Sequence, residues 1–201
     1  MIYIIFAVLA AYLLGSFPTA YVFGKVLKNI DIREHGSGNV GATNVFRVIG
    51  KTPGIIALVI DFAKGLVAVT VLPAVLVNLM PGELPSYVYI LLGTAAIAGH
   101  IWTIFLRFKG GKGVATTAGV MAGLAPVLFA VCLSVWVFFF AVWRYVSVAS
   151  IAAAVSLPFF AMVFGKDLSF VIFCSAICMV GAYSHRSNIK RLLNGEEKKL
   201  L

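Results

Sequence analysis

Glycines and short polar side chains alternate through the segment 35–44, which is followed by Arg47. Three glycines let the backbone turn tightly and expose N–H groups, and four short side chains supply further hydrogen-bonding groups. Such a nest of donors suits an anion, phosphate above all. We predict a phosphate site here, and the alternative is a polar turn rich in glycine. The residues concerned are Gly36, Ser37, Gly38, Asn39, Gly41, Thr43, Asn44 and Arg47.

A second glycine-rich segment reads Phe108-Lys-Gly-Gly-Lys-Gly113 and precedes an apolar run. Its sequence has only a superficial similarity to a nucleotide-binding P-loop. Gly113 stands where Ser or Thr should follow the lysine, and Leu106 stands in place of the first glycine. ATP hydrolysis is therefore not expected. Two interpretations stay open: a basic loop with turn glycines, or contact of an anionic substrate with Gly110, Gly111, Lys112 and Gly113.

Two further polar clusters follow apolar runs. In the first, Arg144–Ser150, Ser150 lies one helical turn inside the run; serines in such helices usually bond to carbonyls of their own helix. In the second, 185–196, a helix would aim His185 and Asn188 at one spot, because they are three residues apart. Arg191 extends that face. The alternative is a basic amphipathic tail lying against lipid headgroups.

Two ionisable residues interrupt the second apolar run. Asp61 and Lys64 are three residues apart, and charges at such depth usually point inward and pair. We predict an ion pair that braces the helices, with substrate contact as the lesser alternative. His100, after Gly99, is interpreted as a packed histidine rather than as a base.

The usual nucleophiles and metal sets are missing from the sequence. No histidine is followed five positions later by aspartate, and neither a G-x-S-x-G nor an H-E-x-x-H motif occurs. No acidic cluster suits Mg²⁺, and the three cysteines lie within apolar runs, as inert thiols do. We predict no metal and no cofactor, and chemistry that does without an activated nucleophile.

The elements that position these clusters are membrane helices. Hydrophobic residues make up 62% of the 201 residues and charged ones 11%, with a mean hydropathy of +1.04. Stretches of about 20 uncharged residues have the length that crosses a bilayer. The formal net charge of +9 then indicates anionic lipids and substrates, not nucleic acid. The apolar runs are Ile2–Gly24, Pro53–Met80, Tyr87–Phe108, Val114–Val142, Val146–Phe164 and Leu168–Ser184.

The distribution of Lys and Arg orients the runs. Basic residues gather in 25–51, in 107–112 and after 184, whereas the connection 81–86 has none. Such residues mark the cytoplasmic side. Splitting the fourth run at Ala125-Pro126 brings Arg144 and the tail to that side too. We predict an all-α bundle of about seven transmembrane helices, with the N-terminus outside and the C-terminus in the cytoplasm; five or six full spans are the alternative.

Two smaller predictions concern the chain as a whole. Ile2–Gly24 is interpreted as a retained transmembrane helix rather than as a signal peptide, because its basic residues follow the apolar run instead of preceding it. No internal repeat, linker or low-complexity tract is visible, so we expect residues 1–201 to form a single domain.

Three of these motifs together resemble the bacterial acyl-phosphate:glycerol-3-phosphate acyltransferase family. They are the segments 36–44, 108–116 and 185–193, with lesser similarity at 15–21 and 61–65. The resemblance covers nearly the whole chain. It implies a seven-helix membrane fold with a site that faces the cytosol, in the bacterial inner membrane.

The activity that this resemblance implies is transfer of a fatty acyl group from acyl phosphate to the 1-hydroxyl of sn-glycerol 3-phosphate. The products would be lysophosphatidic acid and inorganic phosphate, in the first acylation of phospholipid synthesis. Membrane lipids and the enzyme that makes acyl phosphate from acyl carrier protein are the implied partners. Glu196 would brace the tail. The implied catalytic residues are Ser37, Lys112, His185 and Asn188, and the implied substrate-binding residues are Asn39, Thr43, Arg47, Gly110, Gly111, Gly113 and Ser150.

Two other function classes compete with an enzyme. An organic-phosphate transporter could use the same basic face as its mouth, but transporters usually show two related halves and broken helices. A lipid-binding scaffold would not need so many polar donors. An acyl phosphate already carries an activated carbonyl, which explains why an acyltransferase of this kind could lack a nucleophile. The proton acceptor for the hydroxyl is then His185 or a substrate phosphate, and we favour the phosphate.

Overall fold

The chain is helical throughout the part described by the computed structural model, residues 1–80 and 82–200. Within these ranges there are ten α-helices and two short 3₁₀ helices, and no strand. They form two compact units, Met1–Leu124 and Ala125–Leu201. The single-domain expectation is not tested by this division and stays a prediction.

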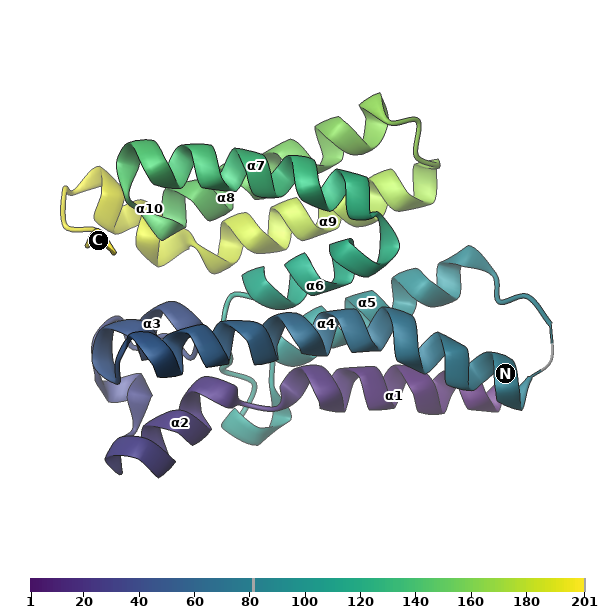
Figure 1. The fold of residues 1–201 in the computed structure, drawn as a ribbon, viewed down its shortest axis with the longest axis horizontal. Helices are drawn as coiled ribbons and strands as arrows, with labels where there is room; N and C mark the ends of the chain where they lie inside the picture. Colours follow the sequence, from purple (N-terminus) through teal and green to yellow (C-terminus); the bar gives the residue numbers. More distant parts are fainter. Residues whose placement is uncertain (81, 201) are drawn as a thin grey trace. The chain divides into compact units, whose positions relative to one another are not determined.

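The first unit contains six α-helices, whose course is seen in Figure 1. Helix α1 packs on α5, α4 packs on α6 and on α5, and the short α3 packs on the start of α4. The 3₁₀ helices Ile32–Glu34 and Ile104–Leu106 lie in the loops. The α-helices are α1 (Ile2–Ser16), α2 (Thr19–Lys28), α3 (Ala42–Val48), α4 (Lys51–Leu79), α5 (Ser86–Ile101) and α6 (Val114–Leu124).

Glycines bring these helices into backbone contact. A Cβ added to Gly15 of α1 would overlap the carbonyl oxygen of Ala96 on α5, and one added to Gly65 of α4 would overlap that of Thr116 on α6. Small residues allow such approach where lipid supplies no hydrophobic drive for helix association. The close helices hold the loops at their ends in fixed positions.

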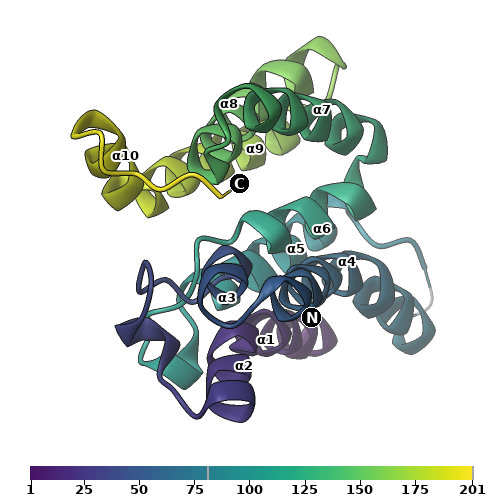
Figure 2. The same ribbon diagram turned by 60° about the vertical axis from the view of Figure 1, so that its left-hand side comes forward.

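The first predicted transmembrane helix is broken, which corrects the expectation of one helix over Ile2–Gly24. It forms α1 and α2, which separate at Phe17-Pro18 (Figure 2). Pro18 has no N–H to donate and disfavours helical geometry at the residue before it. Two side chains bond the carbonyl oxygens at the break: Thr103 Oγ1 donates to Ser16 O at 2.6 Å, and Lys64 Nζ donates to Phe17 O at 2.7 Å.

The second unit contains α7 (Pro126–Trp143), α8 (Val146–Val163), α9 (Leu168–Ser184) and α10 (Arg186–Leu193). Helix α8 packs on both α7 and α9. Helix α7 begins at the proline where the fourth apolar run was predicted to split. Helices α9 and α10 meet at a bend of 55°.

The prediction of an all-helical membrane bundle is confirmed. Among the described residues, five segments are long and apolar enough to cross a membrane, with α1 and α2 counted together, and the bent pair α9–α10 would make a sixth. Helix α6 has only 11 residues, so it spans about half of the hydrocarbon thickness.

Candidate active site

The loop before α3 is held in shape by a buried amide rather than by the ligand-binding side chains. Asn44 Oδ1 accepts a hydrogen bond from the Ser37 N–H at 2.9 Å, and Asn44 Nδ2 donates to the carbonyl oxygens of Ile32 and His35 at 3.2 and 3.0 Å. Gly36 has φ +65°, and a Cβ there would overlap Asn44 Oδ1. Asn44 is therefore a brace for the loop and not one of its phosphate donors.

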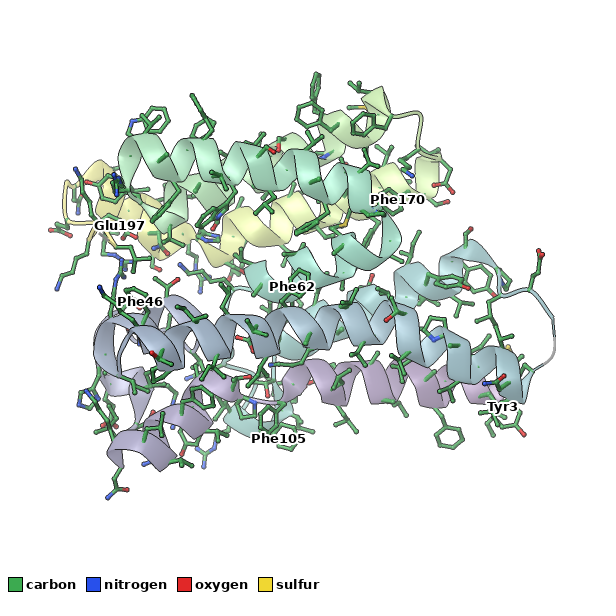
Figure 3. All side chains as sticks on the ribbon, in the orientation of Figure 1. Tyr3, Phe46, Phe62, Phe105, Phe170 and Glu197 are labelled. Carbon is green, nitrogen blue, oxygen red and sulfur yellow. The ribbon has the colours of Figure 1, made fainter. Side chains whose placement is uncertain are left out.

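The predicted phosphate-binding side chains lie on either side of Asn44 in the sequence, on the loop and on α3. Ser37 is exposed, and Asn39, Thr43 and Arg47 are half-buried. Helix α3 carries Thr43 and Arg47 and, with Phe46, packs on the start of α4 (Figure 3). A Cβ on Gly54 of α4 would come 2.6 Å from the Cα of Phe46. The arrangement leaves short polar groups on the braced loop and one guanidinium on the helix that follows it.

The second glycine-rich loop folds back onto the end of α5. The Gly110 N–H donates to Ile101 O at 2.9 Å, and the Gly111 N–H donates to His100 O at 3.0 Å. Arg107 and Phe108 both have positive φ, 53° and 61°, which is uncommon for side chains of this size. A tight reversal therefore precedes the glycines. It brings Lys112, which is half-buried, to the start of α6.

The two glycine-rich loops, about 70 residues apart in sequence, lie against each other. A Cβ on Gly111 would stand 2.8 Å from the carbonyl oxygen of Val40 and would overlap the ring of His100. Only glycine fits there, because both neighbours are packed. The structure thus brings the first and second predicted clusters into one place in the first unit.

Asp61 and Lys64 pair as predicted. Lys64 Nζ lies 2.6 Å from Asp61 Oδ1, and their side chains are 4% and 2% exposed, respectively. Thr19 Oγ1 also donates to Asp61 Oδ1, at 2.8 Å. His100 is buried as expected, with its Nδ1 3.9 Å from the same carboxylate oxygen. These groups lie beneath the loops rather than on them.

In the second unit the predicted residues lie in the first turns of α8 and at the junction of α9 with α10. His185 separates α9 from α10 and is 3% exposed, while Asn188 in the first turn of α10 is 5% exposed. His185 Nδ1 lies 2.8 Å from Gly181 O. A carbonyl oxygen only accepts, so Nδ1 carries the hydrogen and Nε2 is the acceptor of the neutral ring. Ser150 Oγ accepts a hydrogen bond from the indole Nε1 of Trp136 at 3.1 Å.

Glu197 organises this end of the unit (Figure 3). Its Oε1 accepts from Ser147 Oγ at 2.9 Å and from Asn188 Nδ2 at 2.6 Å, and its Oε2 accepts from Arg191 Nε at 2.7 Å. Burial alone would raise the pKa of Glu197, but the hydrogen bonds from Asn188, Arg191 and Ser147 outweigh burial and lower it. The bracing role predicted for Glu196 falls on Glu197, since Glu196 is exposed.

Three functional candidates had not been singled out for these roles from the sequence. Asn44 and Glu197 act as braces, and Trp136 bonds to Ser150. Only Asn44 lies inside a recognised motif. The sequence feature that could have pointed to Glu197 is its position directly after Glu196, the carboxylate that was assigned the bracing role. No sequence feature points to Trp136. Within the described ranges, no three His, Cys, Asp or Glu side chains gather as metal ligands would.

Comparisons with known proteins give one consistent result. A family model described as glycerol-3-phosphate acyltransferase matches residues 5–195. The chain is 47% identical to the glycerol-3-phosphate acyltransferase of Desulforudis audaxviator, covering 94% of this chain and 91% of that one. It is 43% identical to glycerol-3-phosphate acyltransferase 2 of Moorella thermoacetica, covering 96% of each chain.

Solved structures agree with these relatives. The crystal structure of PlsY (YgiH), an integral membrane glycerol 3-phosphate acyltransferase, in its glycerol 3-phosphate form has a TM-score of 0.87 and 40% identity, covering 98% of this chain and 94% of that one. The lysophosphatidic acid form of PlsY has a TM-score of 0.84 and 39% identity, with the same coverage of both chains.

Proposed function

Because this chain belongs to the glycerol-3-phosphate acyltransferase family, we propose that it transfers a fatty acyl group from acyl phosphate to the 1-hydroxyl of sn-glycerol 3-phosphate. The products are lysophosphatidic acid and inorganic phosphate. The observation that carries the proposal is the meeting of the two glycine-rich loops at Val40 and Gly111. It brings the residues around Ser37 and those around Lys112 into one place, as two phosphorylated substrates require.

The substrates dictate what the protein must supply. An acyl phosphate is a mixed anhydride: the hydroxyl oxygen attacks its carbonyl carbon, the new C–O ester bond forms, and the bond to phosphate breaks. Both substrates carry negative charge and repel each other, so cationic and N–H groups have to hold them together. Such positioning is worth on the order of 7 kcal/mol or more, and donors aimed at the developing oxyanion add to it.

We assign the residues to these tasks as follows. Arg47 and Lys112, with Ser37 and Ser150, hold phosphate groups, and His185 and Asn188 orient substrate. The bond from Trp136 to Ser150 Oγ supports this assignment, because a hydroxyl that accepts one hydrogen bond keeps its own hydrogen as a donor for an anion. Asn39, Thr43 and the glycines Gly110, Gly111 and Gly113 shape the site for glycerol 3-phosphate.

The hydroxyl proton passes to a phosphate oxygen of the substrates in this proposal. His185 Nδ1 donates to the carbonyl oxygen of Gly181, so Nε2 is the nitrogen through which His185 would accept the proton in the competing mechanism. The test is His185→Gln, with rates measured across pH 5.5–8.5 and both KM values. A parent kcat that follows an ionisation near pH 6.5, absent from the variant at unchanged KM, would contradict the phosphate-base mechanism.

We further propose a multi-pass protein of the bacterial inner membrane, with its site facing the cytoplasm and the enzyme that supplies acyl phosphate as a partner. Charge bias supports this orientation. In a chain whose three native cysteines are replaced by alanine, Glu83→Cys should react with an impermeant maleimide in intact cells. Glu196→Cys should react only after permeabilisation. The reverse pattern would contradict the orientation.

The decisive test of the activity uses purified protein with palmitoyl phosphate and glycerol 3-phosphate. Phosphate and lysophosphatidic acid should form in equal amounts, and only when both substrates are present. Ser37→Ala should weaken the reaction, and Ser134→Ala is the matched control because its hydroxyl bonds within its own helix, to Ala130 O. Phosphate release without glycerol 3-phosphate would indicate a hydrolase, and transport without release would indicate a transporter.

A further inference from the structure

A small polar cavity lies at the break between α1 and α2, beneath the loop 107–113. Its free volume is about 10 Å³, roughly the space that one water molecule occupies. The polar part of its lining comes from four helices and one loop of the first unit. It includes Ser16, Thr19, Asp61, His100, Gly110 and Gly111.

The cavity wall is a fixed ionic cluster. Lys64 bonds to Asp61 and also to Phe17 O at the break, and Thr19 donates to the same carboxylate oxygen, Asp61 Oδ1. The cluster joins α1, α2 and α4 at a depth where polar groups are costly unless they are satisfied.

One hydroxyl of this wall lacks a protein partner. Ser16 is 1% exposed, and its Oγ has no hydrogen bond among the described residues. A buried hydroxyl left unpaired costs free energy. A water bonded to Ser16 Oγ and to other polar groups of the wall removes that cost.

The roof of the cavity is the substrate loop itself. Gly110 and Gly111 donate to the last carbonyls of α5, and the ring of His100 fills the space beneath Gly111. His100 also faces Asp61 across 3.9 Å. Any shift of the cluster is therefore transmitted through His100 to the backbone that precedes Lys112.

We propose that this cavity binds one ordered water, and that the water with Asp61, Lys64, Thr19 and His100 positions the Gly110–Gly111 backbone. These are positioning residues, because they act on substrate only through the loop. The expected change in KM rests on the proposed function, whereas the expected change in the loop backbone does not.

The test uses two variants and one control. The first variant is His100→Leu. The second is the double variant Asp61→Asn with Lys64→Gln, which removes both charges but keeps hydrogen-bond donors and acceptors, and the control is Thr94→Val. Thr94 lies on α5, is exposed, and bonds only to Ile90 O of its own helix. In both test variants the amides of Gly110 and Gly111 should exchange hydrogen about tenfold faster than in the parent. The KM for glycerol 3-phosphate should rise about fivefold with little change in kcat. Thr94→Val should match the parent.

Two outcomes would overturn the inference. One is unchanged exchange at Gly110 and Gly111 in both variants, and the other is faster exchange spread evenly over all helices, which indicates general destabilisation. A crystal structure of the parent that resolves waters should show one within hydrogen-bonding distance of Ser16 Oγ, and a dry cavity contradicts the water. If the parent makes no lysophosphatidic acid, the proposed function fails while the exchange result still decides the positioning role.

Discussion

In the unit Met1–Leu124 the candidate residues are positioned mainly by glycine backbone contacts, with Asn44 as a side-chain brace, whereas in the unit Ala125–Leu201 they are positioned by side chains. The first relies on glycines at positions where a Cβ would meet a carbonyl oxygen, as at Gly110 and Gly111. The second relies on one carboxylate, Glu197, that accepts hydrogen bonds from three side chains. The first arrangement should tolerate no added atom, and the second should respond to charge and pH.

The largest effect is expected from Gly110→Ala. Its Cβ would overlap His100 O, so the loop must move, and a displacement of about 1 Å can cost roughly a hundredfold in rate. Steady-state kinetics should show kcat/KM reduced by about that factor. Gly181→Ala is the control, because its Cβ meets only Ala154 Cβ at 3.6 Å. If Gly110→Ala kept the parental kcat/KM, the claim that glycine backbone contacts position the loop in the first unit would be contradicted.

Glu197→Ala should destabilise the second unit. It leaves the donors of Ser147, Asn188 and Arg191 without their acceptor, which should cost about 2–4 kcal/mol of unfolding free energy and lower activity about tenfold. Thermal unfolding in detergent and initial rates measure both. Glu196→Ala, one position away and exposed, should stay within about 0.5 kcal/mol of the parent. Equal effects of the two variants would contradict the assignment.

The charge of Glu197 predicts an acid-sensitive contribution to stability. Since folding lowers its pKa, the stabilisation is fully present above the ordinary carboxyl value of about 4.3 and is lost as pH falls through the lower folded value. Unfolding temperatures of the parent and of Glu197→Gln should therefore converge as the pH is lowered below about 4.3. A constant difference down to acid would show that charge is not what stabilises the network.

The smallest effect is expected from Trp136→Phe. It keeps an aromatic ring but removes the donor to Ser150 Oγ, and one hydrogen bond of this kind is worth about 1 kcal/mol. The KM for a phosphate substrate should rise at most about fivefold. Trp143→Phe, at a ring that stacks on Phe139, should leave KM unchanged. A larger effect of Trp143→Phe would point to packing rather than to Ser150.

Local patterns in the sequence were sufficient for the membrane bundle and for the glycine loops. Asp61 and Lys64 could be paired because two charges three residues apart in an apolar run have few other partners. The glycine density around Ser37 predicted an anion loop, and around Lys112 it left a basic turn and an anion loop as alternatives. Whether these residues hold substrate stays a prediction.

Long-range contacts explain what the sequence did not reveal. Glu196 and Glu197 are the same residue type, and they differ in which way their side chains point. That direction is set by the contact of the C-terminal tail with α8, where Glu197 meets Ser147. The contact of Val40 with Gly111 joins loops that no local pattern connects. The break at Pro18 was missed because apolar residues continue on both sides of it, so that hydropathy alone shows one uninterrupted span.

The backbone contacts between α1 and α5 and between α4 and α6 also limit how the chain can change over generations. Gly15 and Gly65 face carbonyl oxygens of neighbouring helices, so a mutation to any other residue requires a second, simultaneous shift of a whole helix. Val59 and Val71, exposed on the outside of α4, can be exchanged for other apolar residues one at a time. Single substitutions are therefore tolerated on the exposed apolar side of α4 and are not tolerated at the glycine contacts.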